Sequence, residues 1–388
     1  MKRPQILILG AILASVVWAD AQVDLRRARG FSANDLFGKG GISRTLNTFP
    51  LIAAGDSWES LPFTEEVVRC AVLPPALDWR ALGGVTAIDT QPQYGCGGCW
   101  VYAATAVFES LIKIATGREV DLSEEQISSC LPNGNHTGIA WQAFNYMQLK
   151  GVTTEQYIPC NFNFPVCSYP AYPDTFYLHD NWILGMWDKP LDERVRTVKY
   201  ILQRFGPVAG GFKVFEDWGS YRQGVYLYDG VSPFGGHHSI EIVGWGDDVS
   251  LPNGGYWVVK NDFGEAWGEN GFFRIGYGEC EIDMAVMFAA WDPTTRYPVF
   301  ALKVGTRYYS AGETVSLPLF ARVPEGRTAS YRAEGLPSGA SYGETTGSFT
   351  WTPRRDQTGE HKILFTAWYD SFETTQKGTL IVLPARRP

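Results

Sequence analysis

The sequence contains little that would bind nucleic acid or hold a resident metal ion. Its 388 residues carry a formal net charge of −8 with no long basic run, which argues against a nucleic-acid partner. The single C-x-x-C pair, Cys96 and Cys99, has neither a second pair nor a matching histidine pair, so neither a metal site nor a cofactor is expected. Internal repeats and low-complexity tracts are also absent. What remains, at 45% hydrophobic and 19% charged residues, is the composition of a globular protein.

The N-terminal residues predict export. Met1–Arg3 is positively charged, Ile6–Trp18 is apolar, and Ala19–Ala21 fits the cleavage site of a signal peptide. The apolar run is too short for a mature membrane anchor, and no later stretch is long and apolar enough to be one. We therefore predict a signal peptide over residues 1–21 and a secreted, extracellular protein. An uncleaved N-terminal anchor is the alternative.

The rest of the chain is long enough for two folded units behind an N-terminal segment. Gly and Pro interrupt residues 22–72, which predicts a loop-rich pro-segment, with a disordered linker as the alternative. Apolar residues then recur at helical spacing, and short β-rich runs follow. Helices are expected at 99–117, 123–129, 140–149 and 192–204, and strands at 208–214, 224–228, 239–244, 256–260 and 271–275. This order predicts an α+β domain over residues 73–294.

A second unit is predicted over residues 297–388, where β-prone segments alternate with Gly, Pro and Ser turns. Such segments occur at 314–319, 347–351 and 362–368, and their spacing predicts a small all-β sandwich. The turn-rich sequences around 335–340, 346–353 and 357–359 resemble the Ig-like, cadherin-like modules of secreted microbial proteins. Such a module would bind a surface, a polysaccharide or a protein substrate, or act as a spacer. We see no acidic cluster in it that would support a calcium site.

Three segments carry the chemistry. The octapeptide at 93–100, Gln-Tyr-Gly-Cys-Gly-Gly-Cys-Trp, places Cys99 directly before a predicted helix. The free N–H groups and positive dipole end of a helix N-terminus stabilise a thiolate, which is the nucleophilic form of cysteine. Taken alone, the two cysteines could also form a redox pair or belong to disulfides. Segments 235–246 and 256–273 add the adjacent His237 and His238, and Asn261.

Together the three segments resemble the papain (cathepsin-like) family of cysteine peptidases. The interval from Cys99 to His238 lies within the family's range of roughly 130–150 residues, and the interval to Asn261 slightly exceeds it. The resemblance covers about 73–291. It implies a helical lobe and a sheet lobe, zymogen maturation, and cysteine-type endopeptidase activity on proteins or peptides. A weak or silent papain fold acting in binding or adhesion is the alternative, and a transglutaminase-like Cys-His acyltransferase is a third reading.

The resemblance implies a role for each residue that matches the family's motifs. Cys99 would be the nucleophile, His238 the base, and Asn261 the group that orients the imidazole. Gln93 would donate a side-chain N–H to the oxyanion, beside the backbone N–H of Cys99. The residues implied in substrate binding are Gly97, Gly98, Gly138, Ser239 and Trp267.

Several positions depart from the family's pattern. Phe263 stands where a tryptophan normally covers the Asn–His hydrogen bond, which predicts reduced activity. His237 directly precedes His238 and could compete with it as the base. The distance to the Val-Gly-Trp sequence at 243–245 favours His238 in that role. Residues 209–211, Ala-Gly-Gly, leave a small wall in the pocket for the second residue before the scissile bond, so a bulky side chain would be admitted. The histidine-bearing loop of some exopeptidases is not evident, which favours an endopeptidase.

Seven cysteines in an exported chain predict disulfides with one thiol left over, and a catalytic Cys99 would be that thiol. The expected pairs are Cys130–Cys167, Cys96–Cys160 and Cys70–Cys280. The first pair follows the family's pattern. In the second, Cys160 takes over as partner of Cys96, because Asn135 stands where the family usually has that partner. The third joins the two cysteines that remain. Six cysteines permit fifteen connectivities, so these pairs are hypotheses.

Overall fold

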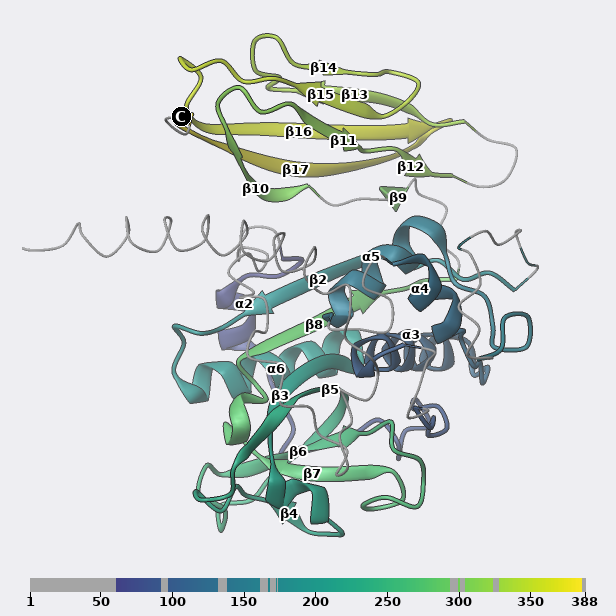
Figure 1. The fold of residues 1–388 in the computed structure, drawn as a ribbon, viewed down its shortest axis with the longest axis vertical. Coiled ribbons are helices and arrows are strands. Elements are labelled where there is room, and N and C mark those ends of the chain that lie inside the picture. Colours follow the sequence, from purple (N-terminus) through teal and green to yellow (C-terminus); the bar gives the residue numbers. More distant parts are fainter. Residues whose placement is uncertain are drawn as a thin grey trace, which may run out of the picture.

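The computed structural model describes residues 61–91, 97–131, 138–160, 167, 172, 174–293, 299–300, 304–323 and 328–385. They form an α+β N-terminal unit, residues 61–293, and an all-β C-terminal unit, residues 299–385, which lies beside it (Figure 1). The predicted fold class is therefore confirmed. The predicted signal peptide, residues 1–21, lies outside the described residues.

The four helices predicted in the N-terminal unit are all present. They are α3 (Cys99–Thr116), α4 (Glu124–Cys130), α5 (Ala140–Lys150) and α6 (Leu191–Phe205). Gly117 ends α3 in a left-handed conformation with φ of 72°, which glycine adopts without strain. The hydroxyl of Ser123 caps α4 by accepting the N–H of Gln126 at 3.1 Å. By length and composition alone α3 could cross a membrane, but 72% of it is buried inside the fold, as expected for a central core helix.

A mostly antiparallel sheet forms the second layer of this unit, in the order β2-β8-β3-β5-β6-β7-β4 with β1 pairing β5. The strands are β1 (Ala76–Asp78), β2 (Asp180–Gly185), β3 (Val208–Phe215), β4 (Val225–Tyr226), β5 (Phe234–Asp247), β6 (Gly255–Lys260), β7 (Phe272–Gly276) and β8 (Ala285–Ala290). Five of them match predicted runs. The sequence did not reveal β1, β2 and β8, and the last two pair with each other over their full length.

The two faces of the sheet build two separate cores. On one face α3 packs against Ala209 of β3 and Met287 of β8. On the other face α6 packs against β8 and β5, in a core that also contains Val208 and Phe212 of strand β3. Because side chains alternate along a strand, β3 serves both cores. This arrangement places the start of α3 and the middle of β5 side by side, where the candidate site lies (Figure 1).

A short segment ahead of β1 belongs to the core of the N-terminal unit. Here α2 (Glu65–Cys70) forms within residues 22–72, where a loop-rich pro-segment was predicted, because Thr64 caps it and two glutamates open its first turn. Phe63 packs edge-on against Tyr200 of α6, with ring centroids 5.0 Å apart. Arg196 of α6 donates hydrogen bonds to three backbone carbonyls of this segment, those of residues 68, 69 and 71. Residues 61–71 are therefore fastened to α6.

Replacing Phe63 by Ala is expected to destabilise the N-terminal unit by about 3–5 kcal/mol, the usual cost of truncating a buried phenylalanine. The ring is only 6% exposed and packs in the same core as α6. Urea unfolding of the full chain, followed by tryptophan fluorescence, measures the change. Val67→Ala in the same segment is the control, because Val67 is 46% exposed. Equal unfolding midpoints for the two variants would show that this segment does not unfold with the core.

The C-terminal unit is built of three small sheets around one core. Its strands are β9 (Val299–Phe300), β10 (Gly305–Ser310), β11 (Val315–Pro318), β12 (Ala321–Arg322), β13 (Ser330–Glu334), β14 (Ser341–Tyr342), β15 (Ser348–Trp351), β16 (Gly359–Tyr369) and β17 (Phe372–Leu383). They pair in the orders β10-β17-β16-β13, β11-β15-β14 and β12-β9. Phe349, Trp351 and Phe365 fill the space between the sheets. The predicted β-sandwich is thus confirmed.

The two units contact each other through polar groups. Gln148 of α5 donates to the carbonyl oxygen of Phe300 at 2.7 Å, and Arg322 of β12 donates to that of Leu178 at 2.8 Å. The guanidinium of Arg322 also lies over the Tyr177 ring, 4.6 Å from its centroid.

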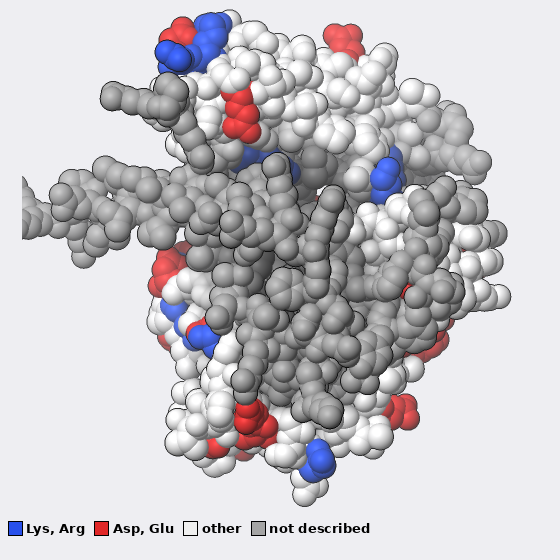
Figure 2. Space-filling view, viewed as in Figure 1, with Lys and Arg blue, Asp and Glu red and all other residues white. Residues whose placement is uncertain are grey.

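On the face shown in Figure 2, acidic and basic side chains of the described residues are interspersed rather than gathered by sign.

Candidate active site

Cys99 is the first residue of α3 and carries a free, partly exposed thiol. The preceding Gly98 is extended, with φ of −90° and ψ of 167°, so the chain turns into the helix immediately before the thiol. The backbone N–H of Ser239 in β5 points at the sulfur, with 3.4 Å between N and Sγ. A helix N-terminus and a backbone donor both favour negative charge on this sulfur.

His238 and Asn261 meet beside this thiol. His238 lies in the middle of β5 and Asn261 directly after β6, and Nε2 of the imidazole is 2.7 Å from Oδ1 of the amide. Because an amide oxygen only accepts, Nε2 carries a proton and Nδ1 is left for the thiol side. Burial of His238 opposes its charging, but the charge of Asp262, the charge of Cys99 and hydrogen bonds to both outweigh it. The net effect raises the pKa of His238 well above its usual value.

The adjacent histidine points elsewhere. Alternation along β5 turns His237 to the opposite face, where its ring packs edge-on against Phe234 with centroids 5.1 Å apart. His238, by contrast, is 8% exposed and lies among Phe212, Trp218 and Phe263. The structure therefore brings His238, and not His237, to Cys99.

Aromatic rings pack around the imidazole that is hydrogen-bonded to Asn261. The centroid of Phe263 is 5.0 Å from that of His238, and Trp218 follows at 5.7 Å. Trp267 packs edge-on against Phe263 at 5.7 Å. Phe263 thus occupies the covering position that the sequence predicted for it, with a smaller ring than tryptophan would provide. Trp267 lies one ring further from the histidine.

Two of the predicted substrate-binding glycines have no room for a side chain. A Cβ on Gly138 would lie 2.4 Å from the ring of Trp100, the residue after the candidate nucleophile. A Cβ on Gly97 would lie 2.5 Å from the hydroxyl oxygen of Ser128, and its φ of 105° also favours glycine. Gly138 therefore lets its segment approach α3 closely, and Gly97 lets the loop before α3 approach α4.

The predicted oxyanion donor, Gln93, lies outside the described residues, but a second glutamine two positions earlier is described. The side-chain amide of Gln91 donates from Nε2 to the carbonyl oxygen of Gly97 at 3.1 Å. Its backbone N–H donates to the carbonyl oxygen of Asp262 at 2.8 Å. Gln91 therefore links the loop entering α3 with the segment that carries Asn261. Sequence reasoning missed it because the family spacing drew attention to Gln93; the repeated glutamine was the available signal.

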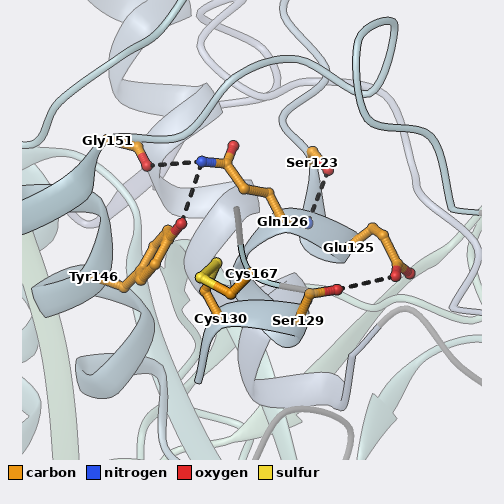
Figure 3. The surroundings of a disulfide bond; sticks show 8 residues. All are labelled: Ser123, Glu125, Gln126, Ser129, Cys130, Tyr146, Gly151 and Cys167. Atoms are coloured by element: carbon orange, nitrogen blue, oxygen red, sulfur yellow. Dashed lines mark hydrogen bonds between the residues drawn. A yellow bond between two sulfur atoms is a disulfide. The ribbon is translucent and has the colours of Figure 1, made fainter. Parts of the chain in front are cut away.

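A disulfide anchors the helical lobe near this site. Cys130, at the end of α4, bonds to Cys167 with a Cα–Cα distance of 4.7 Å, which confirms that predicted pair (Figure 3). Beside it, Gln126 donates to the Tyr146 hydroxyl at 3.2 Å and to the Gly151 carbonyl oxygen at 3.3 Å, fastening α4 to α5 (Figure 3). Cys160 is also disulfide-bonded, and its predicted partner Cys96 lies outside the described residues.

The predicted pair Cys70–Cys280 is wrong, because both residues are free thiols. Cys70 is exposed at the end of α2, with its sulfur 3.4 Å from a carboxylate oxygen of Glu66. Cys280 lies in the turn after β7, half-buried against Tyr226, and burial raises its pKa to about 12. The expectation assumed that Cys99 alone would remain unpaired, and cysteine counting cannot detect two further free thiols.

Behind the site lies a group of buried carboxyls. Carboxyl oxygens of Asp89, Glu109 and Glu124 lie within 4.8 Å of one another. Burial raises the pKa of Glu109 to about 8 and that of Glu124 well above its usual value. Thr86 and Thr105 also donate hydrogen bonds to these two glutamates. Retained protons and these hydrogen bonds reduce the negative charge that the group would otherwise bury.

Because of these carboxyls, we expect the free energy of unfolding to fall as pH rises from about 6.5 to 8. The raised pKa of Glu109 means that the folded state holds a proton the unfolded chain has released, and each such proton costs about 1.4 kcal/mol per pH unit. Thermal melting at pH 6.5 and pH 8 measures the difference. Glu109→Gln, which stays neutral at both values, should reduce it, whereas exposed Glu360→Gln should not. Equal slopes for all three proteins would contradict the prediction.

Comparison with known proteins defines the class of this fold and site. A sequence model described as "Papain family cysteine protease" matches residues 73–290, and one described as "Putative Ig domain" matches residues 294–382. Since the first match spans more than half of the chain, this protein belongs to the papain family of cysteine proteases.

Individual relatives agree with that assignment. The oryzain gamma chain of Oryza sativa subsp. japonica is 33% identical over 218 residues, covering 54% of this chain and 57% of its own length. Pro-cathepsin H of Bos taurus is 32% identical over 214 residues, covering 53% and 61%. The structure of digestive procathepsin L2 from Tenebrio molitor larval midgut matches with a TM-score of 0.50 and 29% identity, covering 57% of this chain and 70% of that one. The chain thus spans about six tenths of the length of these curated relatives.

Proposed function

We propose that this protein is a secreted cysteine-type endopeptidase that hydrolyses peptide bonds in proteins or peptides. The observation that carries the proposal is the meeting of three groups from distant parts of the chain at the start of α3. The Cys99 sulfur accepts the Ser239 N–H at 3.4 Å, and His238 shares a 2.7 Å hydrogen bond with Asn261 in the same place. A nucleophile, its base and an orienting group are the parts that thiol-dependent amide cleavage requires.

The first half of the proposed reaction is acylation. The Cys99 thiolate attacks the scissile carbonyl carbon, a C–S bond forms, and the carbonyl oxygen becomes an oxyanion. The backbone N–H of Cys99 and a glutamine side chain, Gln93 or Gln91, donate hydrogen bonds to this oxygen. The C–N bond then breaks as the His238 imidazolium gives its proton to the leaving amine, and a thioester remains.

The second half is hydrolysis of the thioester. Neutral His238 takes a proton from a water molecule, whose oxygen attacks the thioester carbon. The C–S bond breaks, the carboxylic acid product leaves, and Cys99 returns as the thiolate beside a protonated imidazole. Asn261 holds the same Nε2–H through both halves, which keeps the ring oriented for each proton transfer.

The proposed function also includes removal of N-terminal segments and a substrate pocket that admits bulky side chains. We expect removal of a signal peptide at residue 21 and of a pro-segment over residues 22–72, of which residues 61–71 pack against α6. Gly211 of β3 lies opposite Ser239 of β5, next to the thiol, and its missing side chain supports a pocket that accepts bulky residues. The C-terminal unit would bind a surface or polysaccharide.

Covalent labelling tests the proposal. An epoxysuccinyl inhibitor should add one inhibitor mass to the full chain, detected by intact mass spectrometry, and should abolish hydrolysis of a fluorogenic peptide. Cys99→Ala should lose both. Cys280→Ala is the control for another half-buried free thiol and should keep both. Labelling without any peptide hydrolysis would favour the alternative of a silent papain fold that acts in binding or adhesion.

Phe263→Trp is expected to raise the rate of peptide hydrolysis severalfold. The Phe263 ring lies 5.0 Å from the imidazole, and a larger indole would exclude more water from the His238–Asn261 hydrogen bond. kcat of the two proteins on one peptide measures the effect, with Phe234→Trp, on the other side of β5, as the control. An unchanged kcat would show that shielding of this hydrogen bond does not limit the rate.

A further inference from the structure

Asp262, the residue after Asn261, carries a buried carboxylate beside the catalytic histidine. Its Oδ1 lies 3.3 Å from Nε2 of His238, and its side chain is 9% exposed. Apart from this imidazole, no described residue donates a hydrogen bond to either of its oxygens. Nε2 of the imidazole therefore faces two acceptors, the Asn261 amide oxygen at 2.7 Å and this carboxylate oxygen.

A buried carboxylate without other donors either keeps a proton or needs a positive charge beside it. Lys260 and Asp262 line one small cavity. The ammonium of Lys260 donates to the Thr86 hydroxyl at 3.0 Å, however, and among the described residues it forms no ion pair with Asp262. Among the residues that the structure describes, the cationic group within ion-pair distance of Asp262 is the imidazole of His238. The carboxylate is therefore matched to a charged imidazolium rather than to a neutral ring.

We propose that Asp262 is a second positioning residue of this site, whose carboxylate shares the Nε2–H of His238 with Asn261 and holds the ring in its charged form. The proposal rests on the proposed function of His238 and adds a group that the Cys-His-Asn assignment does not contain. A charged imidazolium keeps its neighbour Cys99 as a thiolate. Asp262 would therefore extend the thiolate–imidazolium pair to higher pH.

The other titratable groups around this pair come from four elements. They are Cys99 and Tyr102 of α3, Asp89 of the segment before it, Glu241 of β5 and Lys260 of β6. Tyr102 stays neutral, since burial raises its pKa. Burial likewise raises the pKa of Asp89, and the charge of Lys260 opposes only part of this rise. Among these described carboxyls, only that of Asp262 lies within 4 Å of the imidazole. Removing its charge should therefore have the largest effect on the protonation of His238.

The test follows the alkylation of Cys99 by iodoacetamide as a function of pH, together with kcat/KM for a peptide. Asp262→Asn, which keeps the shape and removes the charge, should move the alkaline limb of both profiles down by about 1–3 pH units, the usual effect of one opposite charge at this distance. Asp262→Glu should keep the limb near its original position. Exposed Glu265→Gln on the same loop loses one charge and should move nothing.

Circular dichroism melting ensures that each variant is folded, and unchanged alkaline limbs in a folded Asp262→Asn protein would overturn the proposal. If the alkaline limb of Asp262→Glu also moved to lower pH, the proposal would be contradicted, because the lost charge would then not be the cause of the shift. Alkylation reports the thiolate even if no peptide is cleaved. A wild-type chain with a normal alkylation profile but no hydrolysis would therefore contradict the proposed function and leave this inference standing.

Sharing of one N–H between two acceptors has a second consequence. Asn261→Ala should lower kcat/KM less in the natural protein than in an Asp262→Asn background, because Asp262 continues to hold the imidazole when the amide is lost. Two contacts that act on the same proton are not additive, and a double-mutant cycle measures their coupling. Fully additive losses would show that Asp262 does not take part in orienting His238.

Discussion

His238→Ala is expected to lower kcat/KM for a peptide substrate by about 10⁴- to 10⁶-fold, the loss seen when a catalytic base is removed from a nucleophile–base unit. Nε2 of this ring is held by Asn261 at 2.7 Å, and the ring lies beside the Cys99 sulfur. No other described histidine reaches that sulfur. Without the imidazole, the thiolate loses its counter-charge and the leaving amine loses its proton donor.

The adjacent residue provides a matched control for this prediction. His237→Ala removes the same side chain one position away, where the ring packs against Phe234 on the opposite face of β5. It should change kcat/KM by no more than about threefold, because exposed or half-buried side chains away from the site contribute little. The opposite pattern, with activity lost in His237→Ala and kept in His238→Ala, would reverse the assignment of the base.

Gln91→Ala is expected to lower kcat/KM by about 10²- to 10³-fold, the usual cost of losing one oxyanion donor. An amide nitrogen carries two hydrogens, and Nε2 of Gln91 uses one of them on the Gly97 carbonyl oxygen at 3.1 Å. The second hydrogen remains for a substrate oxygen beside α3. The Gly97 contact holds the amide against the loop that leads into Cys99, whose backbone N–H is the other donor of the proposed hole.

Gln93→Ala is the matched comparison, because the family spacing assigns the same role to Gln93. A large loss in Gln93→Ala and a small one in Gln91→Ala would return the donor to Gln93 and leave Gln91 as a structural link between two loops. Small losses in both would mean that the oxyanion is held by backbone donors alone. A change in kcat with KM unchanged identifies a contact made only in the transition state.

Local sequence patterns predicted the helices and most central strands well. Ser123 and Gly117 mark helix ends by chemistry that acts within one turn, and the structure shows both caps. The pair β2 and β8 escaped prediction because both strands are buried along almost their whole length and therefore show no alternation of apolar and polar residues. α2 escaped because six residues are too few to show helical periodicity.

The sequence by itself determined the papain-family motifs and the α+β order followed by a β-sandwich, since these depend on residue types at set spacings. The disulfide Cys130–Cys167 was expected from the resemblance to the family. Only the tertiary structure decided which histidine faces Cys99 and that Cys70 and Cys280 stay free. It alone also showed that Asp262 lies 3.3 Å from the imidazole. The reason is physical: these relations depend on which face of a strand or loop meets a helix end from another part of the chain, and spacing along the sequence does not encode that distance.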